Sequence, residues 1–246
     1  MKKEYGFILI VYLIMHLSSF IGIPLVYKIG INQGVEPSMM QQLTPGYWLT
    51  FSFSVALVII LLILKKAEIR QTRLHSDPPM HVQGSTFWAI AGVFLAFFAQ
   101  DIAIRIELLL GVTPGSENTQ QIIQIIEYVP FTMIVASILG PILEEIVFRK
   151  VIFGSLYERF PFWVAALISS VIFSAAHMEL EHTLLYSAMG FTFAFLYVKT
   201  KRLIVPIIAH VSMNTLVILG QYFFRDELEK YIEEAEKISG FIGGFF

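Results

Sequence analysis

Long apolar runs separated by short polar segments make up most of this chain. The runs occupy residues 6–27, 47–64, 87–110, 128–157, 161–178, 183–199 and 203–224. A helix of about 20 apolar residues crosses the hydrocarbon core of a bilayer with its backbone groups hydrogen-bonded internally. The pattern therefore predicts an all-α fold, a polytopic transmembrane helix bundle of about seven spans within a range of six to eight.

Composition supports a membrane protein and narrows its chemistry. Hydrophobic residues make up 56% and charged residues 15% of the 246-residue chain, far from the averages of soluble domains. No repeat or linker divides it, so we expect a single integral membrane domain over residues 1–246, in the lipid bilayer of the cell membrane. The net charge of −2, without a basic block, argues against nucleic-acid binding. The absence of cysteine excludes disulfides and thiolate chemistry, and nothing specifies an oligomeric state.

The polar segments suggest an orientation. The start "MKKEYGFILIVYLIM" lacks a cleavage site after its apolar run and is expected to be a retained first span. With the N-terminus in the cytoplasm, most of the 17 Lys and Arg residues fall on the cytoplasmic side. The segment "KKAEIRQTRLHSDPPMHVQGS" is then cytoplasmic and "GVTPGSENTQ" external. The tail "RDELEKYIEEAEKISGFIGGFF" is expected to be a charged, solvated or interfacial helix.

The fourth apolar run contains the polar sequence "PILEEIVFRK". Ionised side chains at membrane depth are costly, and they usually have a function. Glu145 and Arg149 are four residues apart, so on an α-helix they share a face and are expected to form an ion pair. Glu144 points about 100° away and remains available for proton transfer. Asp101 and Arg105 have the same spacing and are expected to form a structural pair.

Two later runs carry histidines at matching spacings. "FSAAH" ends at His177, and "HVSMN" places His210 and Asn214 on one helix face. Glu144 and His177 lie about 16.5 residues on either side of the "ERFP" turn, so antiparallel helices would bring them to the same depth. His210, about nine residues after the basic "KTKR" turn, lies at a shallower level by this kind of count. The residues by themselves are compatible with a hydrolytic or metal site, a proton-coupled carrier or a buried scaffold.

Taken together, E-E-x-x-x-R, F-x-x-x-H and H-x-x-x-N resemble the motifs of one family. This is the CPBP family, which comprises the type 2 CAAX prenyl proteases and bacteriocin-processing relatives, also called Abi. The resemblance covers a catalytic core of about residues 130–220, and the start of the chain also resembles bacterial YdiL-type members. It implies an intramembrane endopeptidase that acts on a membrane-associated peptide or protein substrate.

The resemblance also implies roles for individual residues. Glu144, with His177, would activate the water molecule that attacks the peptide bond. His210 and Asn214 would stabilise the oxyanion of the tetrahedral intermediate. In addition, Arg149 and Glu145 match the supporting part of the first motif.

A metal-dependent scheme and two other functions remain open. The family is also classed as metalloproteases, and a zinc ion held by Glu144, His177 and His210 is the alternative to water activated by glutamate alone. We favour the scheme without a cofactor, because H-E-x-x-H is absent. The other functions are a non-catalytic membrane peptide binder, such as a bacteriocin-immunity protein, and a proton-coupled transporter.

Overall fold

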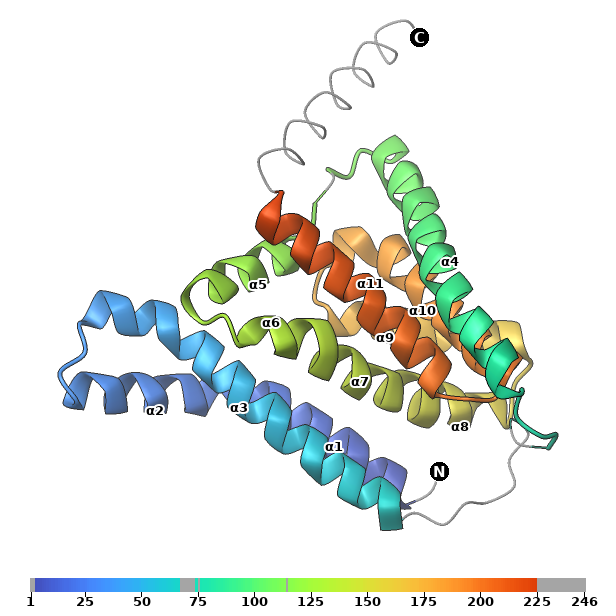
Figure 1. Cartoon of the computed structure of the whole chain (residues 1–246), viewed down its shortest axis with the longest axis horizontal. Coiled ribbons are helices and arrows are strands. Elements are labelled where there is room, and N and C mark those ends of the chain that lie inside the picture. The colour runs from blue at the N-terminus through green and yellow to red at the C-terminus, as the bar shows by residue number, and fades with distance from the viewer. Residues whose placement is uncertain (1–2, 67–73, 75, 114, 225–246) are drawn as a thin grey trace, which may run out of the picture.

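The computed structural model of the chain describes residues 3–66, 74, 76–113 and 115–224 (Figure 1). Over these residues all regular secondary structure is helical, which confirms the all-α prediction. The charged tail predicted after residue 224 and part of the segment after α3 lie outside the described residues.

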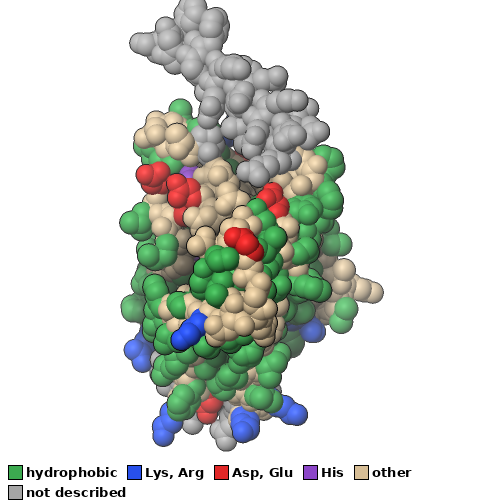
Figure 2. All heavy atoms as spheres, turned by 90° about the vertical axis from the view of Figure 1, so that its left-hand side faces the viewer, with side chains coloured by type: hydrophobic (Ala, Val, Ile, Leu, Met, Phe, Trp, Pro, Cys, Tyr) green, Lys and Arg blue, Asp and Glu red, His purple; other side chains and the backbone are tan. Residues whose placement is uncertain are grey.

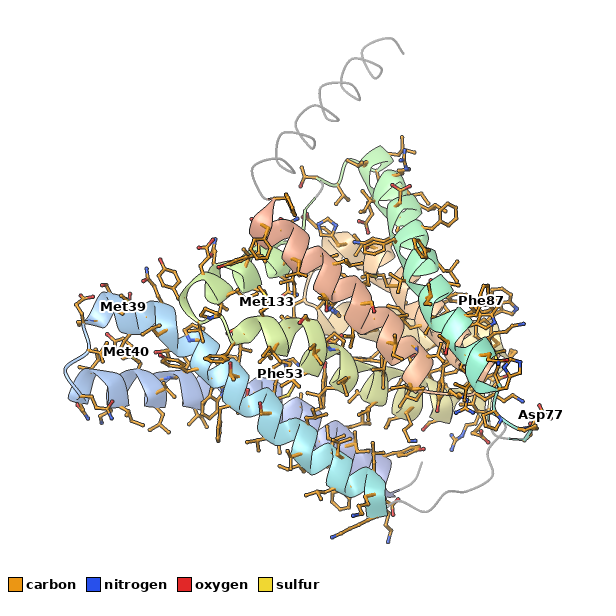
Figure 3. The ribbon with its side chains drawn as sticks, in the orientation of Figure 1. Met39, Met40, Phe53, Asp77, Phe87 and Met133 are labelled. Carbon is orange, nitrogen blue, oxygen red and sulfur yellow. The ribbon has the colours of Figure 1, made fainter. Side chains whose placement is uncertain are left out.

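An N-terminal hairpin forms one side of the molecule. It consists of α1 (Lys3–Leu17), α2 (Ser19–Asn32) and α3 (Pro37–Lys66). The first two helices meet at a 44° bend, and α3 starts well before the predicted position 47. Glycines allow close packing here, because a Cβ at Gly22 would lie 1.9 Å from Trp48 and one at Gly30 would lie 2.3 Å from Met40. Met40 lies between α2 and α3 (Figure 3).

The other side is built around α10 (Thr183–Thr200). This helix packs against α4 (Val82–Leu109), α9 (Phe162–Ala176) and α11 (Ile204–Phe223). Ala89, Ala96 and Ala103 form a buried stripe on α4, and Gly190 of α10 lies against Ser170 of α9. Small residues of this kind let helices approach closely where lipid supplies no hydrophobic driving force between them.

A chain of short helices connects the two sides. Its elements are α5 (Glu117–Tyr128), α6 (Thr132–Ile134), η2 (Val135–Leu139), α7 (Gly140–Glu144), η3 (Glu145–Phe153) and α8 (Gly154–Tyr157). The predicted span 128–157 is therefore not one regular helix, since η2 and η3 are π-helical. Pro141 lacks the N–H that an α-helix would donate at this point, which favours a change of hydrogen-bond pattern. π-Helical turns often mark functional sites.

The described helices do not confirm seven spans. By length and composition α3, α4 and α11 can cross a membrane, as can the bent pair α1–α2 if it is counted as one span. The predicted span 161–178 contains the 15-residue helix α9, which is short for a crossing, and the span 128–157 is interrupted as described above. Large apolar side chains nevertheless cover the outside, and Phe20, Phe94 and Trp163 are all at least 70% exposed, as contact with lipid requires.

Charge is distributed unevenly along the vertical direction of the figures. Figure 2 shows Lys and Arg side chains toward the lower end of one face and most Asp and Glu side chains in its upper half. Lys65 and Lys66 end α3 at this lower end (Figure 1). The prediction that the N-terminus is cytoplasmic rests on this kind of bias, in which basic residues are concentrated at one end of the molecule.

Candidate active site

The three sequence motifs meet at a single cavity of about 1030 Å³. Glu144 lines it from the end of α7, His177 from the end of α9, and His210 and Asn214 from α11. Helices that are distant in the sequence thus bring all four predicted site residues together. The wall facing them comes from α1 and α3, where Phe53 packs beside Gly140 (Figure 3).

A buried ion pair lies directly behind Glu144. The Nε atom of Arg149 lies 3.1 Å from Oε2 of Glu145, and both side chains are 0% exposed, which confirms the predicted pair. The guanidinium carbon also lies 4.5 Å from the ring centre of Phe173 and 5.4 Å from that of Phe193. These cation–π contacts supplement the carboxylate, because a buried charge without compensation is strongly destabilising.

His210 lies between the two adjacent glutamates. Its Nδ1 atom is 2.9 Å from Oε1 of Glu145, and its Nε2 atom is 3.7 Å from Oε2 of Glu144. Its ring stacks on Phe193 with centroids 4.6 Å apart. An ionised carboxylate only accepts hydrogen bonds, so Nδ1 is the protonated nitrogen that faces Glu145. Glu145 therefore orients His210, a contact that the sequence analysis did not predict.

Glu144 and His177 have functional atoms directed to the cavity. The Glu144 side chain is 18% exposed, in contrast to the fully buried Glu145. His177 caps the C-terminus of α9, where its Nδ1 atom lies 2.9 Å from the backbone carbonyl oxygen of Phe173. A carbonyl only accepts, so Nδ1 carries the proton and Nε2 is left as a proton or hydrogen-bond acceptor.

The spacing F-x-x-x-H has a structural explanation. The Phe173 ring lies 4.6 Å from the ring of His177 and 6.1 Å from that of His210, edge-on to both, so it packs against both histidines. The same ring contacts the guanidinium of Arg149. Phe173 thus fixes the positions of three charged or titratable side chains by packing.

Asn214 completes this side of the cavity. Its Nδ2 atom donates a 3.4 Å hydrogen bond to the backbone oxygen of Ala136 in η2. It lies one turn beyond His210 on α11, so both side chains border the same space.

Several cavity residues were missed in the sequence. Tyr12 and His16 reach the cavity from α1, with ring centroids 4.7 Å apart, and the ring of His16 lies 5.8 Å from that of Phe53. A single histidine in the first apolar run, one turn after a tyrosine, was the feature of the sequence that could have indicated a contribution of this run to the site. Gln100 of α4 also lines the cavity, and its Oε1 atom is buried without a hydrogen-bond partner.

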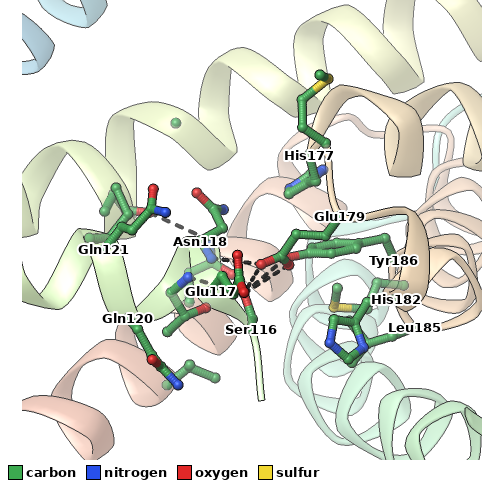
Figure 4. Close-up of a pocket in the computed structure, with 18 of the residues that line it drawn as sticks. Ser116, Glu117, Asn118, Gln120, Gln121, His177, Glu179, His182, Leu185 and Tyr186 are labelled. Carbon is green, nitrogen blue, oxygen red and sulfur yellow. Dashed lines mark hydrogen bonds between the residues drawn. The ribbon is translucent and has the colours of Figure 1, made fainter. Parts of the chain in front are cut away.

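Polar side chains line the cavity next to the exposed residues Asn118, Gln120 and Gln121 of α5, and we call this part of the cavity its mouth (Figure 4). We call four of them the rim cluster: Ser116, Asn118, Glu179 and Tyr186. Burial alone would raise the pKa of Glu179, but hydrogen bonds from the Asn118 backbone, Tyr186 and Ser116 outweigh this and hold that pKa below its usual value of 4.5.

A buried pair lies beside the rim cluster. The Nδ1 atom of His182 is 3.0 Å from Oε2 of Glu107. Burial alone would lower the pKa of His182, but the hydrogen bond and the charge of Glu107 outweigh this and raise that pKa above its usual value of 6.5.

The geometry does not fit the alternative zinc site. Within the described part of the chain, no three His, Asp or Glu side chains are arranged to hold a metal ion. The predicted set Glu144, His177 and His210 does not form such an arrangement, although the Nδ1 contacts of both histidines leave their Nε2 atoms open. We therefore derive no step through a metal.

Comparisons with known proteins place these residues in context. The family described as "Type II CAAX prenyl endopeptidase Rce1-like" matches residues 126–216, a range that contains all three motifs. The chain is 46% identical over 248 residues to "Putative membrane peptidase YdiL" of Bacillus subtilis (strain 168), with 100% of both chains covered. It is 35% identical over 193 residues to "Membrane-embedded CAAX protease MroQ" of Staphylococcus aureus (strain USA300), covering 76% of this chain and 78% of that one. No solved structure matches.

These matches also limit the earlier expectations. The family description names a CAAX prenyl endopeptidase. The first relative is named a membrane peptidase and the second a CAAX protease. They give no support to the predicted likeness to Abi proteins or to a metalloprotease.

Proposed function

Because the chain belongs to the Rce1-like family of type II CAAX prenyl endopeptidases, we propose that it hydrolyses a peptide bond in a membrane-associated peptide or protein precursor. It is a multi-pass membrane protein of a membrane-peptidase family. The observation that carries the proposal is the convergence of Glu144, His177, His210 and Asn214 on one cavity. The cavity is large enough to hold several residues of an extended peptide.

In the proposed reaction Glu144 is the general base. Its carboxylate faces the cavity while Glu145 is held behind it, so the two adjacent glutamates do not compete for the same proton. His177 accepts a hydrogen bond from the attacking water at Nε2 and directs the water toward Glu144. General-base catalysis of this kind contributes roughly 10²–10⁴-fold to the rate.

The tetrahedral intermediate is stabilised from α11. Water adds to the scissile carbonyl carbon, and the negative charge on its oxygen is met by the Asn214 amide and by His210. His210 donates from Nε2 in this step as an imidazolium, whose Nδ1 atom faces the carboxylate of Glu145, while Glu144 holds the proton taken from the water. The carbon–nitrogen bond then breaks, and Glu144 returns the proton to the leaving amine.

Substitution of Glu144 by Gln tests the proposal. This change keeps the shape of the side chain and removes the base, so peptide cleavage by the purified protein in proteoliposomes is expected to fall by about 10²-fold or more. Glu181→Gln is the matched control, because Glu181 is an exposed carboxylate that does not line the cavity. A Glu144→Gln protein that folds and cleaves like the control would contradict the proposal and favour a non-catalytic peptide binder.

The same pair of variants identifies the substrate. Membranes of cells that produce the Glu144→Gln protein should accumulate the uncleaved precursor, and those that produce the Glu181→Gln protein should not. Mass spectrometry of membrane peptides measures the difference directly.

A further inference from the structure

One carboxylate organises the mouth of the cavity. Glu179 lies in the link between α9 and α10, and both of its oxygens are engaged (Figure 4). Oε1 accepts a 2.6 Å hydrogen bond from the backbone N–H of Asn118, and Oε2 accepts one of the same length from the hydroxyl of Tyr186. The Ser116 hydroxyl lies 2.9 Å from Oε2. Glu179 thereby ties the N-terminal turn of α5 to α10.

Tyr186 carries this connection to the catalytic side of the cavity. Its ring stacks on the imidazole of His177, with centroids 4.1 Å apart and planes inclined by 27°. Its hydroxyl is held by Glu179, so the ring beneath His177 is fixed at its far end. The position of α5 and the orientation of His177 are thus linked through two side chains.

The link that carries Glu179 is itself anchored from the opposite side. Glu107 of α4 accepts a 2.9 Å hydrogen bond from the backbone N–H of Leu185 at one carboxylate oxygen. Its other oxygen contacts His182, as described above. The link can therefore serve as a fixed point against which α5 is held.

The face that α5 presents to the cavity suits a peptide. Asn118, Gln120 and Gln121 line the cavity and carry amides, which can donate and accept hydrogen bonds together (Figure 4). The backbone of an extended peptide offers the same alternation of N–H and C=O groups. Beside these amides α5 packs through Ile123 and Ile126 against Ile218 of α11, and Ile123 and Ile218 also line the cavity.

We propose that α5 is the substrate gate of this peptidase and that Glu179 and Tyr186 are positioning residues that couple closure of the gate to the orientation of His177. When α5 moves outward to admit a peptide, Glu179 loses the Asn118 and Ser116 contacts and Tyr186 is less restrained. When α5 closes over the peptide, Glu179 and Tyr186 hold His177 in its working orientation. This inference rests on the proposed role of His177 in peptide hydrolysis.

The absence of cysteine from the chain allows a direct test of the gate. A single cysteine in place of Val217, which lines the cavity from α11, reports access when labelled with a water-soluble maleimide in proteoliposomes. Glu179→Gln and Tyr186→Phe are each combined with Val217→Cys. Each is expected to raise the labelling rate about tenfold over Val217→Cys alone, because each removes a hydrogen bond to a charged group. Glu181→Gln should label like the unsubstituted background.

Kinetics test the coupling to His177. Glu179→Gln is expected to lower kcat and raise KM, because both the gate and the Tyr186 ring are released. Tyr186→Leu removes the ring that stacks on His177 and should lower kcat by about tenfold or more, whereas Tyr186→Phe keeps the ring but frees it from Glu179 and should lower kcat by less, to about the same extent as Glu179→Gln. A role in folding alone would lower the amount of active protein and leave KM unchanged.

The outcomes separate the gate from the peptidase activity. Labelling in Glu179→Gln equal to that in Glu181→Gln would overturn the gate proposal, even if Glu144→Gln is inactive. Equal kcat values for Tyr186→Leu and Tyr186→Phe would overturn the positioning of His177. If Glu144→Gln retains full cleavage, the peptidase mechanism fails instead, while the labelling experiment still reports on the gate.

Discussion

The Nδ1 atom of His210 lies 2.9 Å from Oε1 of Glu145. This contact joins the first and third sequence motifs and gives the two adjacent glutamates different environments. Glu145 is fully buried between His210 and Arg149, whereas Glu144 retains access to the cavity. The pair E-E is therefore not redundant, because Glu145 orients a histidine while Glu144 faces the cavity, where we propose that it acts as the base.

Loss of the Glu145 charge is expected to destabilise the protein. In Glu145→Gln the guanidinium of Arg149 stays buried without its carboxylate, and breaking such a pair costs about 3–5 kcal/mol. We expect the variant to unfold at a markedly lower temperature in detergent, measured by a thermal shift assay.

A second pair with the same spacing supplies the control. Asp101 and Arg105 form a 2.8 Å ion pair, but their side chains are 55% and 72% exposed. Exposed pairs contribute little, so Asp101→Asn should leave the unfolding temperature unchanged. If both substitutions have the same effect, burial is not what makes the Glu145–Arg149 pair important.

Stability and activity should separate in a double variant. Glu145→Gln combined with Arg149→Met removes both charges, and replacing a buried ion pair by groups of similar volume is often neutral for stability. The double variant should therefore unfold closer to the unsubstituted protein than Glu145→Gln does. Its peptide cleavage should remain low, because His210 loses the carboxylate that orients its ring through Nδ1. Recovery of both properties would show that Glu145 acts only through stability.

The pair of Glu107 and His182 predicts a pH dependence of stability. The pKa of His182 is raised in the folded state, so the pair stabilises the fold fully below its usual value of 6.5. That contribution is lost as the pH rises through the raised pKa. The unfolding temperature of the unsubstituted protein should exceed that of Glu107→Gln most at about pH 6 and by less at about pH 8. A difference that grows with pH would contradict this assignment.

Local features of the site were predictable from the sequence, and interhelical ones were not. The Glu145–Arg149 pair depends only on positions within one helical segment. The contact of Glu145 with His210 spans 65 residues and depends on how α11 packs. The depth count took Glu144 from the "ERFP" turn and His210 from the "KTKR" turn and assumed regular helices, whereas 135–139 and 145–153 are π-helical and His210 lies beside Glu144.

The gate was missed for a different reason. The segment "ENTQQIIQIIEY" is too polar for a span, and the sequence pattern assigns only its start, "ENTQ", to the external segment. Its isoleucines nevertheless recur at helical spacing, and Ile123 and Ile126 are buried. The contacts of Glu179 with Ser116 and Asn118 join residues more than 60 positions apart, which no local motif indicates.

Asn214 provides the sharpest test of oxyanion stabilisation. Its amide borders the cavity beside His210 and contacts the protein only through a 3.4 Å bond to Ala136 among the described hydrogen bonds. Loss of one oxyanion donor typically lowers kcat about 10²–10³-fold. Asn214→Ala should therefore lower kcat and kcat/KM equally, since the interaction forms only in the transition state.

The neighbouring threonine is the control for this substitution. Thr215 bonds to the carbonyl of Val211 in its own helix and does not line the cavity. Thr215→Val should keep kcat and KM close to those of the unsubstituted protein, whereas Asn214→Ala should lose kcat at nearly constant KM. A rise in KM without a fall in kcat for Asn214→Ala would mean that the amide binds the ground state of the peptide, and Asn214 would then belong to substrate recognition instead of oxyanion stabilisation.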